Sequence, residues 1–425
     1  GYFNKVKFDT MVNEVAGNIQ STSGAILILL MVGALAGTWL ISGIIPTMIY
    51  YGLLILNPTI FLAACVVICS VISVATGSSW TTSATVGIAL IGIADALGIG
   101  LGMTAGAILS GAYFGDKMSP LSDTTNLAPA MAGTDLFTHI KYMALTTVPT
   151  ITITLIAFII IGLNLDTSGT TDTSAILASI EKSFTITPWL FIVPVIVIFL
   201  IVKKTSPLIA LLVGTLAGAV AALIVQPDIV LAVSGMNELN FISGYKGLMN
   251  AITVDTAVET DSETLNDLFA SSGMQGMLGT IWLIICAMVF GGIMEAIGAL
   301  SRISKALLNL FHTTFGLFAS TVFSCLALNV TASDQYLAIV VPGKMFAKAY
   351  KDKGLAPENL SRSLEDSGTV TSVLIPWNTC GAYHSGVLGV PVLSYAGYAF
   401  FNYLSPFMTL LFAAIGLKIR KISTK

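Results

Sequence analysis

The segment Gly115-Asp-Lys-Met-Ser-Pro-Leu-Ser-Asp-Thr-Thr-Asn-Leu-Ala-Pro129 is a polar stretch between long apolar stretches. It holds two carboxylates (Asp116 and Asp123), a lysine, an asparagine and several hydroxyl side chains. In a bilayer such a segment is tolerated only where protein buries it or where it lines a water-filled cavity. We therefore expect this segment to form an ion or substrate site.

The composition predicts a membrane protein. Hydrophobic residues make up 55% of the chain and charged residues 10%, whereas soluble domains carry roughly 25% charged residues. The mean hydropathy is +0.89. A net charge of −3 without a basic patch gives no indication of nucleic-acid binding. The five cysteines lie in or beside apolar segments without metal-ligand spacing, which favours a packing role.

Apolar windows of about 20 residues can cross a bilayer. They lie near 24–45, 58–76, 138–163, 186–202, 205–225, 275–298, 314–332 and 392–417. Shorter segments broken by Gly, Pro, Ser and Thr lie at 77–95, 99–115, 119–131, 333–349 and 367–390. Such segments are typical of broken helices and re-entrant hairpins. The predicted fold class is an all-α integral membrane protein, a polytopic bundle with two inverted repeats, broken helices and re-entrant hairpins.

Loop charges predict the orientation. Lys203-Lys204, Arg302 with Lys305, and the basic stretch 344–362 indicate the cytoplasmic side. Loops 164–185 and 226–273 are poor in Lys and Arg and indicate the external side. The side of the C-terminus stays open. The chain starts at Gly1 without a methionine, and we expect an N-terminal portion ahead of it.

An internal repeat is visible in three landmarks. Gly37-Thr-Trp-Leu-Ile-Ser-Gly43 matches Gly292-Ile-Met-Glu-Ala-Ile-Gly298 in glycine spacing. A polar break follows in each half, at 77–83 and 329–335, and Thr124-Thr-Asn-Leu-Ala-Pro129 matches Thr371-Ser-Val-Leu-Ile-Pro376. The expected organisation is a first transmembrane repeat (1–163), connecting helices with an external loop (164–273) and a second repeat (274–425).

The first polar break offers hydroxyls and freed backbone carbonyls, which suit a small hard cation such as sodium. The candidate ligands are Ser78, Ser79, Thr81 and Thr82. Helix–helix packing through small residues is the alternative.

The quoted segment is the stronger candidate. Asp116 and Asp123 are seven residues apart, and Pro120 between them disfavours one continuous helix. At least one carboxylate should therefore sit at a helix break, where a proton and sodium compete for it. Lys117 could pair with a neighbouring carboxylate, and a structural ion pair with Asp116 is the alternative. The candidates are Asp116, Ser119, Ser122, Asp123, Thr124, Thr125 and Asn126.

The second half supplies a similar set: Asn329, Thr331, Ser333, Asp334, Thr371, Ser372 and Asn378. The expected sodium ligands across both halves are Ser79, Asp123, Thr124 and Asp334. Glu365 and Asp366 precede a candidate hairpin, and a cytoplasmic surface position is equally open for them. His384 is a weaker site candidate, and Glu295 is left open between functional and interfacial.

The quoted segment closely resembles the signature of the NhaC-type sodium/proton antiporters. Gly37-Thr-Trp, Ser42-Gly43 and Ile45-Pro-Thr-Met-Ile-Tyr-Tyr-Gly52 extend the resemblance upstream. It implies a multi-pass secondary antiporter of the cell membrane, with sodium as transported substrate and no cofactor. Malate/lactate antiporters carry the same signature, so a small carboxylate substrate remains an alternative. No arginine lies near either motif to clamp a carboxylate, which slightly weakens that alternative.

Other classes are less well supported by the sequence. No repeated pore-lining filter indicates a channel. Phe114-Gly-Asp116 is only a faint echo of an intramembrane aspartyl protease motif, and no P-loop or His-Glu-x-x-His occurs. The expected partners are sodium, protons and membrane lipid, with no nucleic acid, and a homodimer is left open.

Overall fold

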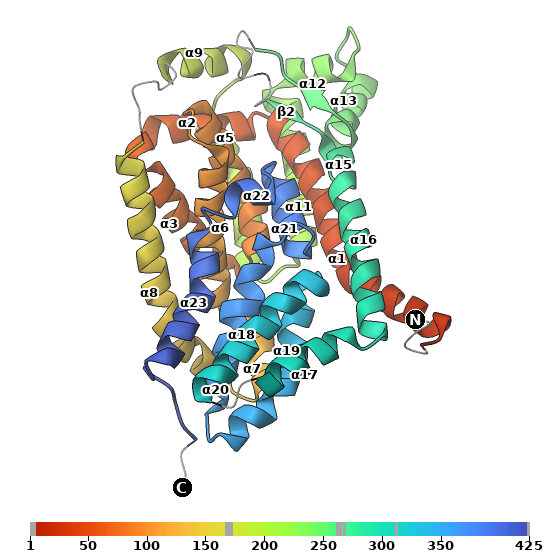
Figure 1. Ribbon diagram of the computed structural model, residues 1–425. Helices are drawn as coiled ribbons and strands as arrows, with labels where there is room; N and C mark the ends of the chain where they lie inside the picture. The colour runs from red at the N-terminus through yellow and green to blue at the C-terminus, as the bar shows by residue number, and fades with distance from the viewer. Residues whose placement is uncertain (1–5, 166–172, 261–265, 267–268, 311–312, 423–425) are drawn as a thin grey trace.

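The computed structural model describes residues 6–165, 173–260, 266, 269–310 and 313–422 (Figure 1). Within these residues, six helical segments are long and apolar enough to cross a membrane. They are α1 (Phe8–Ile41), α3 (Pro58–Thr76), α8 (Leu136–Leu163), α11 (Pro207–Val225), α15 with α16 (Gly273–Ala296) and α18 (Thr314–Thr331). This confirms the all-α polytopic fold class.

One bent pair of helices passes the same test as a unit and would be a seventh span of the described residues. Residues 174–183 of α9 (Thr173–Ser183) and 188–202, which include α10 (Ile192–Val202), form a pair bent by 85°. The two-residue strands β1 (Thr256–Ala257) and β2 (Ala270–Ser271) pair antiparallel.

Two predicted spans differ from the observed helices. The window 24–45 ends earlier, because Gly43 adopts a left-handed φ of 80° and α2 (Ile44–Ile55) starts after it. The window 392–417 is divided into α22 (Val392–Tyr395) and α23 (Phe400–Ala414) by a turn at 396–399. Hydropathy averages side chains over a window and does not detect such changes in backbone direction.

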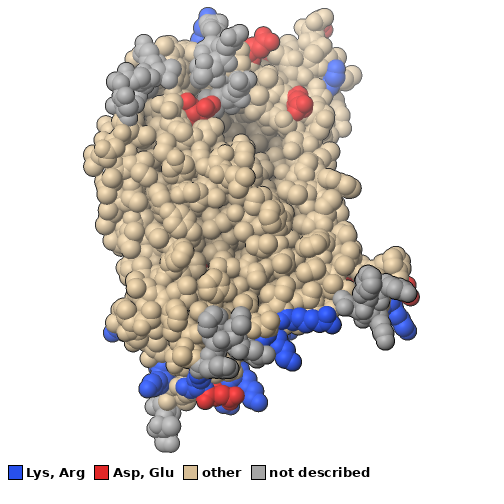
Figure 2. Space-filling view, viewed as in Figure 1, with Lys and Arg blue, Asp and Glu red and all other residues tan. Residues whose placement is uncertain are grey.

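The two ends of the molecule differ in charge. The first and the last described residues of the chain lie at one end of the molecule, and Figure 2 shows Lys and Arg mainly at that end. The helices α9, α12 (Pro227–Ser234) and α13 (Phe241–Thr253) lie at the opposite end (Figure 1). Because basic residues favour the cytoplasm, we assign the end with the first and the last described residues to the cytoplasm. The predicted orientation of the loops agrees with this arrangement.

The two halves of the bundle are inverted relative to each other. α1 runs from the cytoplasmic end outward, whereas α16 (Leu278–Ala296) runs inward (Figure 1). Both end at a left-handed glycine, Gly43 with φ 80° and Gly298 with φ 69°. A short helix follows each glycine, α2 at the external end and α17 (Ala299–Leu310) at the cytoplasmic end.

Four helix breaks follow in corresponding order. α3 turns back at 77–78 into α4 (Ser79–Thr82), and α18 turns back at 332–334 into α19 (Gln335–Asp352). α6 (Leu101–Met118) breaks at 119–122 before α7 (Asp123–Ala132). In the second half α20 (Pro357–Leu364), η3 (Glu365–Thr369) and η4 (Ser372–Leu374) break at 375–378 before α21 (Thr379–Leu388). At these four breaks the described residues therefore form two re-entrant hairpins and two broken helices.

Each helix after a break begins with a side-chain cap. Ser78, Ser122, Asp334 and Asn378 accept hydrogen bonds from backbone N–H groups of the first turn. The caps satisfy donors that a helix start otherwise leaves unpaired. They explain why Ser, Asp and Asn occur at these positions of an apolar chain.

The caps also correct the register of the predicted repeat. Pro120 and Pro376 each lie two residues before a cap, Ser122 and Asn378. Thr124–Pro129 therefore does not correspond to Thr371–Pro376 as predicted, because Pro129 lies inside α7. The shared letters Thr and Pro led to the wrong alignment.

Close packing holds the first hairpin against the broken helix. α6 contacts α3 through Gly111 and Gly115. A Cβ atom at Gly111 would lie 2.3 Å from the carbonyl oxygen of Val66, and one at Gly115 would lie 2.6 Å from that of Ser70. Glycine is therefore required for α6 to bring Asp116 beside the hairpin tip.

A cytoplasm-facing cavity at the four helix breaks

A cavity of about 690 Å³ lies where the four breaks meet, and we call it the central cavity. Its wall includes the first hairpin tip, the start of α7, the start of α19 and Thr379 at the start of α21. The wall also includes residues of α1 and the exposed Lys204 in the turn between α10 and α11. Because that turn has the basic charge of the cytoplasmic side, we infer that the cavity opens toward the cytoplasm.

Asp116 lies in the last turn of α6 and is 7% exposed. The Ser79 hydroxyl donates to its carboxylate at 2.7 Å, and the Ser79 backbone N–H donates at 3.2 Å. The Thr125 hydroxyl contacts the backbone carbonyl of Asp116 at 3.1 Å. Through its carboxylate and its backbone carbonyl, Asp116 thus connects the first hairpin with both halves of the broken helix.

Asp123 is the first residue of α7 and is exposed on the cavity wall. The side-chain amide of Asn126 fixes the break before it, donating to the carbonyls of Pro120 at 3.0 Å and Ser122 at 2.6 Å. Asp116 and Asp123 therefore face one cavity from the two sides of one break. An oxygen-rich wall of this kind suits a hard cation.

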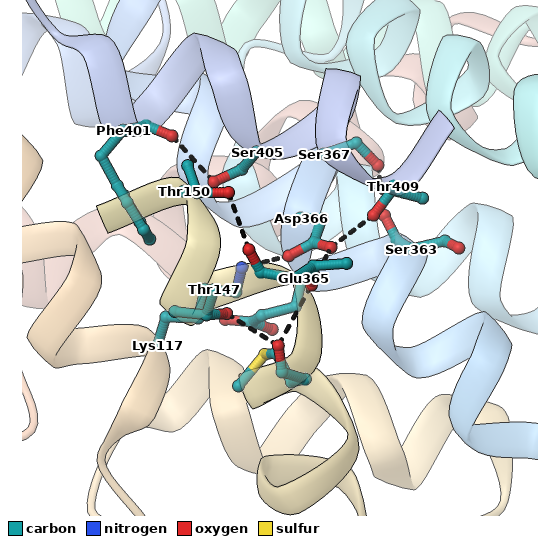
Figure 3. A network of polar contacts seen from close by, with 12 residues as sticks. Lys117, Thr147, Thr150, Ser363, Glu365, Asp366, Ser367, Phe401, Ser405 and Thr409 are labelled. Carbon is teal, nitrogen blue, oxygen red and sulfur yellow. Dashed lines mark hydrogen bonds and ion pairs between the residues drawn. The ribbon is translucent and has the colours of Figure 1, made fainter. Parts of the chain in front are cut away.

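Lys117 does not pair with Asp116. Its ammonium bonds to Asp366 on η3, and both side chains are fully buried. Asp366 also accepts hydrogen bonds from the hydroxyls of Thr146, at 2.9 Å, and Thr409. Figure 3 shows Lys117, Asp366 and Thr409 meeting in one network, with Glu365 nearby. The alternative of a structural ion pair is thus realised with a different partner.

Glu365 and Asp366 are fully buried, so they are not cytoplasmic surface charges. The Thr124 hydroxyl of α7 donates to Oε1 of Glu365 at 3.0 Å. Both residues lie on π-helical η3, a type of irregularity that is frequent at functional sites. The hydroxyl-rich stretch that follows them, residues 367–372, was the sequence signal that could have placed them in the core.

In the second half, Asp334 caps α19, is 6% exposed and lines the cavity. Asn329 lies behind it and donates to the carbonyl of Gly368 at 2.8 Å. The Asn378 amide donates to the side-chain oxygen of Asn329 at 3.1 Å, which connects the second hairpin with the second broken helix.

The sequence-predicted site residues thus divide into two groups. Those on the cavity wall are Ser78, Thr81, Asp116, Ser122, Asp123, Thr124, Asn126 and Asp334. Those that support the wall from behind or lie outside it are Ser79, Thr82, Ser119, Thr125, Asn329, Thr331, Ser333, Thr371, Ser372 and Asn378. Within the second group, Ser119, Asn329 and Asn378 hold the breaks in place: Ser119, for example, donates to the carbonyl of Val74 at 2.8 Å.

An aromatic contact that the sequence did not indicate joins the two halves at the cavity wall. The rings of Trp80 and Tyr383 stack with centroids 3.9 Å apart, and the Tyr383 hydroxyl donates to the carbonyl of Trp80 at 3.2 Å. Trp80 lines the cavity, whereas His384 and Glu295 do not. His384 is fully buried against Trp80 and Tyr113.

The known proteins that this chain resembles are antiporters by name. The model of the Na+/H+ antiporter family matches residues 111–417. The chain is 37% identical to the Na(+)/H(+) antiporter NhaC of Alkalihalophilus pseudofirmus, over 99% of this chain and 88% of that protein. The Na(+)/H(+) antiporter NhaC of Bacillus subtilis is 36% identical over 93% of this chain and 85% of its own length. The Malate-2H(+)/Na(+)-lactate antiporter of Bacillus subtilis is 37% identical over 97% of this chain and 83% of its own length.

Proposed function

Because the chain belongs to the Na+/H+ antiporter family, we propose that the central cavity exchanges sodium for protons across the cell membrane. The resemblance noted in the sequence is thereby confirmed as a family relationship. The chain is a multi-pass membrane transporter. The observation that carries the proposal is the convergence of four helix breaks from two inverted halves on one carboxylate-bearing cavity.

We assign sodium to the break between α6 and α7. The carboxylates of Asp116 and Asp123 supply negative charge there, and the hydroxyls of Ser79, Ser122 and Thr124 lie around them. Carboxylate and hydroxyl oxygens are the ligands that hard cations prefer. The same carboxylate oxygens also bind protons. Sodium and protons therefore compete for one site, which is the simplest basis of exchange.

Exchange also requires that the site does not switch its access from one side of the membrane to the other while it is empty. A bare carboxylate pair carries charge that is costly to move through a low-dielectric interior. A bound sodium ion or proton reduces that cost. The site therefore changes sides readily only when it is occupied, and each passage returns one type of cation for the other.

The inverted halves supply the two access states. In this structure the cavity opens to the cytoplasm, and the contact between Trp80 and Tyr383 lies in its wall. Two halves related by inversion can exchange their conformations, which opens the same site to the opposite side. We expect the hairpin tips at 77–78 and 332–334 to change their contacts when the cavity changes from one access state to the other.

Sodium-coupled exchange of an organic anion is a second candidate, favoured by the size of the cavity. About 690 Å³ exceeds what a sodium ion with a few waters needs, at roughly 30 Å³ of liquid volume for each water. Four helix starts line the cavity, and helix N-termini favour anions. Lys204 at the mouth adds a positive charge.

Flux through purified protein in liposomes tests the proposal. An imposed sodium gradient should move protons in the opposite direction without any organic anion. The same gradient should be tested with malate or lactate present. Proton movement that requires the organic anion would favour the second candidate, and no sodium-dependent flux under either condition would contradict both.

A further inference from the structure

An aromatic pair marks one end of the central cavity. Trp80, just after the tip of the first hairpin, lines the cavity. Its ring stacks on that of Tyr383, which is fully buried in α21 and is not part of the cavity wall. The Tyr383 hydroxyl also donates to the backbone carbonyl of Trp80. A stacking contact and a hydrogen bond thus join the first hairpin to the second broken helix where the cavity ends.

The segments behind this pair lead to the external end of the molecule. After α4 the chain continues through η1 (Ser83–Gly87) into α5 (Ile88–Ala96), which packs against α2. α21 continues to α22, which lies nearer the external end (Figure 1). η1 and α21 pack closely, since a Cβ atom at Gly87 would lie 3.0 Å from the Leu388 side chain. Separation of η1 from α21 would therefore connect the cavity with the external side.

Two polar residues behind the pair have no hydrogen-bond partners in this packing. His384 follows Tyr383 and is fully buried, and neither of its ring nitrogens has a partner among the residues that the structure describes. Its ring packs against those of Trp80 and Tyr113, with centroids 6.3 Å and 5.5 Å apart. Ser83, at the start of η1, is also fully buried, and its hydroxyl has no partner within the described part of the chain.

These polar groups are costly in the state that the structure shows. A buried polar group without a hydrogen bond is less stable than the same group in water. An apolar ring would fill the position of His384 without that cost. The cost is recovered when the same groups contact water in a second state of the protein. A transporter with alternating access has such a state, because the external side opens when the cytoplasmic side closes.

We propose that Trp80 and Tyr383 form the external gate of the central cavity, and that His384 and Ser83 line the path that opens behind this gate. The proposal rests on the proposed function, since it names the residues that transported ions pass between the cavity and the external side. In the closed state the aromatic pair separates His384 and Ser83 from the cavity. In the open state water reaches both residues and fills the path.

The two kinds of residue have opposite effects on the gate. Tyr383→Phe keeps the stacked ring and removes only the hydrogen bond to Trp80, which favours the closed state. The ratio of open to closed protein should rise roughly two- to tenfold, which corresponds to about 0.5–1.5 kcal/mol for one hydrogen bond. His384→Phe removes the unpartnered nitrogens from the closed state and their contact with water from the open state. It should lower the same ratio at least about fivefold.

External access to residue 83 measures this ratio in the full-length chain. In a Cys286→Ser background, which removes the exposed native cysteine among the described residues, Ser83→Cys is treated with a membrane-impermeant thiol reagent. Intact cells test the external side and inside-out vesicles test the cytoplasmic side, and the background without Ser83→Cys gives the blank. Labelling should occur from the external side. Its rate should be roughly two- to tenfold higher with Tyr383→Phe and at least about fivefold lower with His384→Phe.

Tyr395→Phe is the matched control. Tyr395 is also a fully buried tyrosine, and its hydroxyl donates to the carbonyl of Val373 at 2.9 Å. Both of these residues belong to the second half of the chain. The substitution therefore removes a comparable hydrogen bond that does not join the two halves, and the labelling rate should stay at that of the parent protein.

Several results overturn the proposal. They are labelling of Ser83→Cys only from the cytoplasmic side, no external labelling, and an external rate that Tyr383→Phe leaves unchanged or that Tyr395→Phe raises equally. If Ser83→Cys does not fold, His384→Cys reports on the same path, and the same results with Tyr383→Phe decide. If His384→Phe does not fold, His384→Leu takes its place, and a rate at or above that of the parent overturns the role of His384.

The labelling test is independent of transport. Sodium/proton exchange by wild type without external labelling of Ser83→Cys would overturn the gate and leave the proposed function in place. External labelling with the expected rates, in a protein whose wild type shows no exchange, would support the gate and contradict the proposed function.

Discussion

The ammonium of Lys117 bonds to the carboxylate of Asp366, which lies 249 residues further along the chain. Lys117 directly follows Asp116, yet the pair is formed across the two inverted halves. The two neighbouring residues of α6 therefore have different roles. Lys117 holds the two halves together, while Asp116 stays available on the cavity wall.

This relationship predicts a stability difference between single and double variants. Lys117→Met leaves the buried carboxylate of Asp366 unpaired, which costs about 3–5 kcal/mol. The double variant Lys117→Met/Asp366→Leu removes both charges and should regain much of that stability. Unfolding of the purified protein in detergent measures both effects. A double variant that loses the sum of the two single effects would show that the pair has no mutual stabilising role.

Asp123→Asn should abolish sodium-coupled proton movement and leave folding largely intact. The reason is that Asp123 is exposed on the cavity wall at the start of α7, so neutral Asn fits the same space without sodium-binding charge. Proton flux in liposomes and thermal unfolding check the two parts. Ser234→Ala, at a buried serine of external helix α12, is the control. Exchange at the wild-type rate would exclude Asp123 from the mechanism.

Much of the fold follows from the sequence, because the length of an apolar segment and the polar residues that interrupt it can be seen in that segment alone. The positions of the breaks were predicted from Pro, Ser and Asn, and these residues serve as caps or precede them. The pairing of Lys117 with Asp366 was not predictable in this way. It depends on how two distant segments pack, and the sequence beside Lys117 offers Asp116 as an equally good partner.

The location of the cavity was predicted in part, whereas the role of its residues stays a prediction. The sequence identified the polar breaks, and the structure places their residues around one cavity or directly behind it. Glu365 was left undecided, because charged residues between a basic loop and an apolar segment are compatible with surface or core. Its burial results from α20, which carries Arg362 and Glu358 into the protein interior as well.

Access to the cavity from the cytoplasm makes a labelling prediction. In a Cys286→Ser background, which removes the exposed native cysteine among the described residues, Asn126→Cys should react with a membrane-impermeant thiol reagent applied from the cytoplasmic side. Asn126 is exposed on the cavity wall. Sodium should slow the reaction, because it occupies the neighbouring carboxylates. Labelling only from the external side would contradict the assigned orientation of the opening.

The most direct test of shared carboxylates is the sodium affinity of the purified protein at several pH values. Sodium binds the ionised carboxylates and protons occupy the same oxygens, so affinity must fall as pH falls. Where protons dominate, we expect the sodium affinity to change by at least about tenfold per pH unit. A sodium affinity that stays constant from acidic to alkaline pH, in protein that remains folded throughout, would contradict competition at the central cavity.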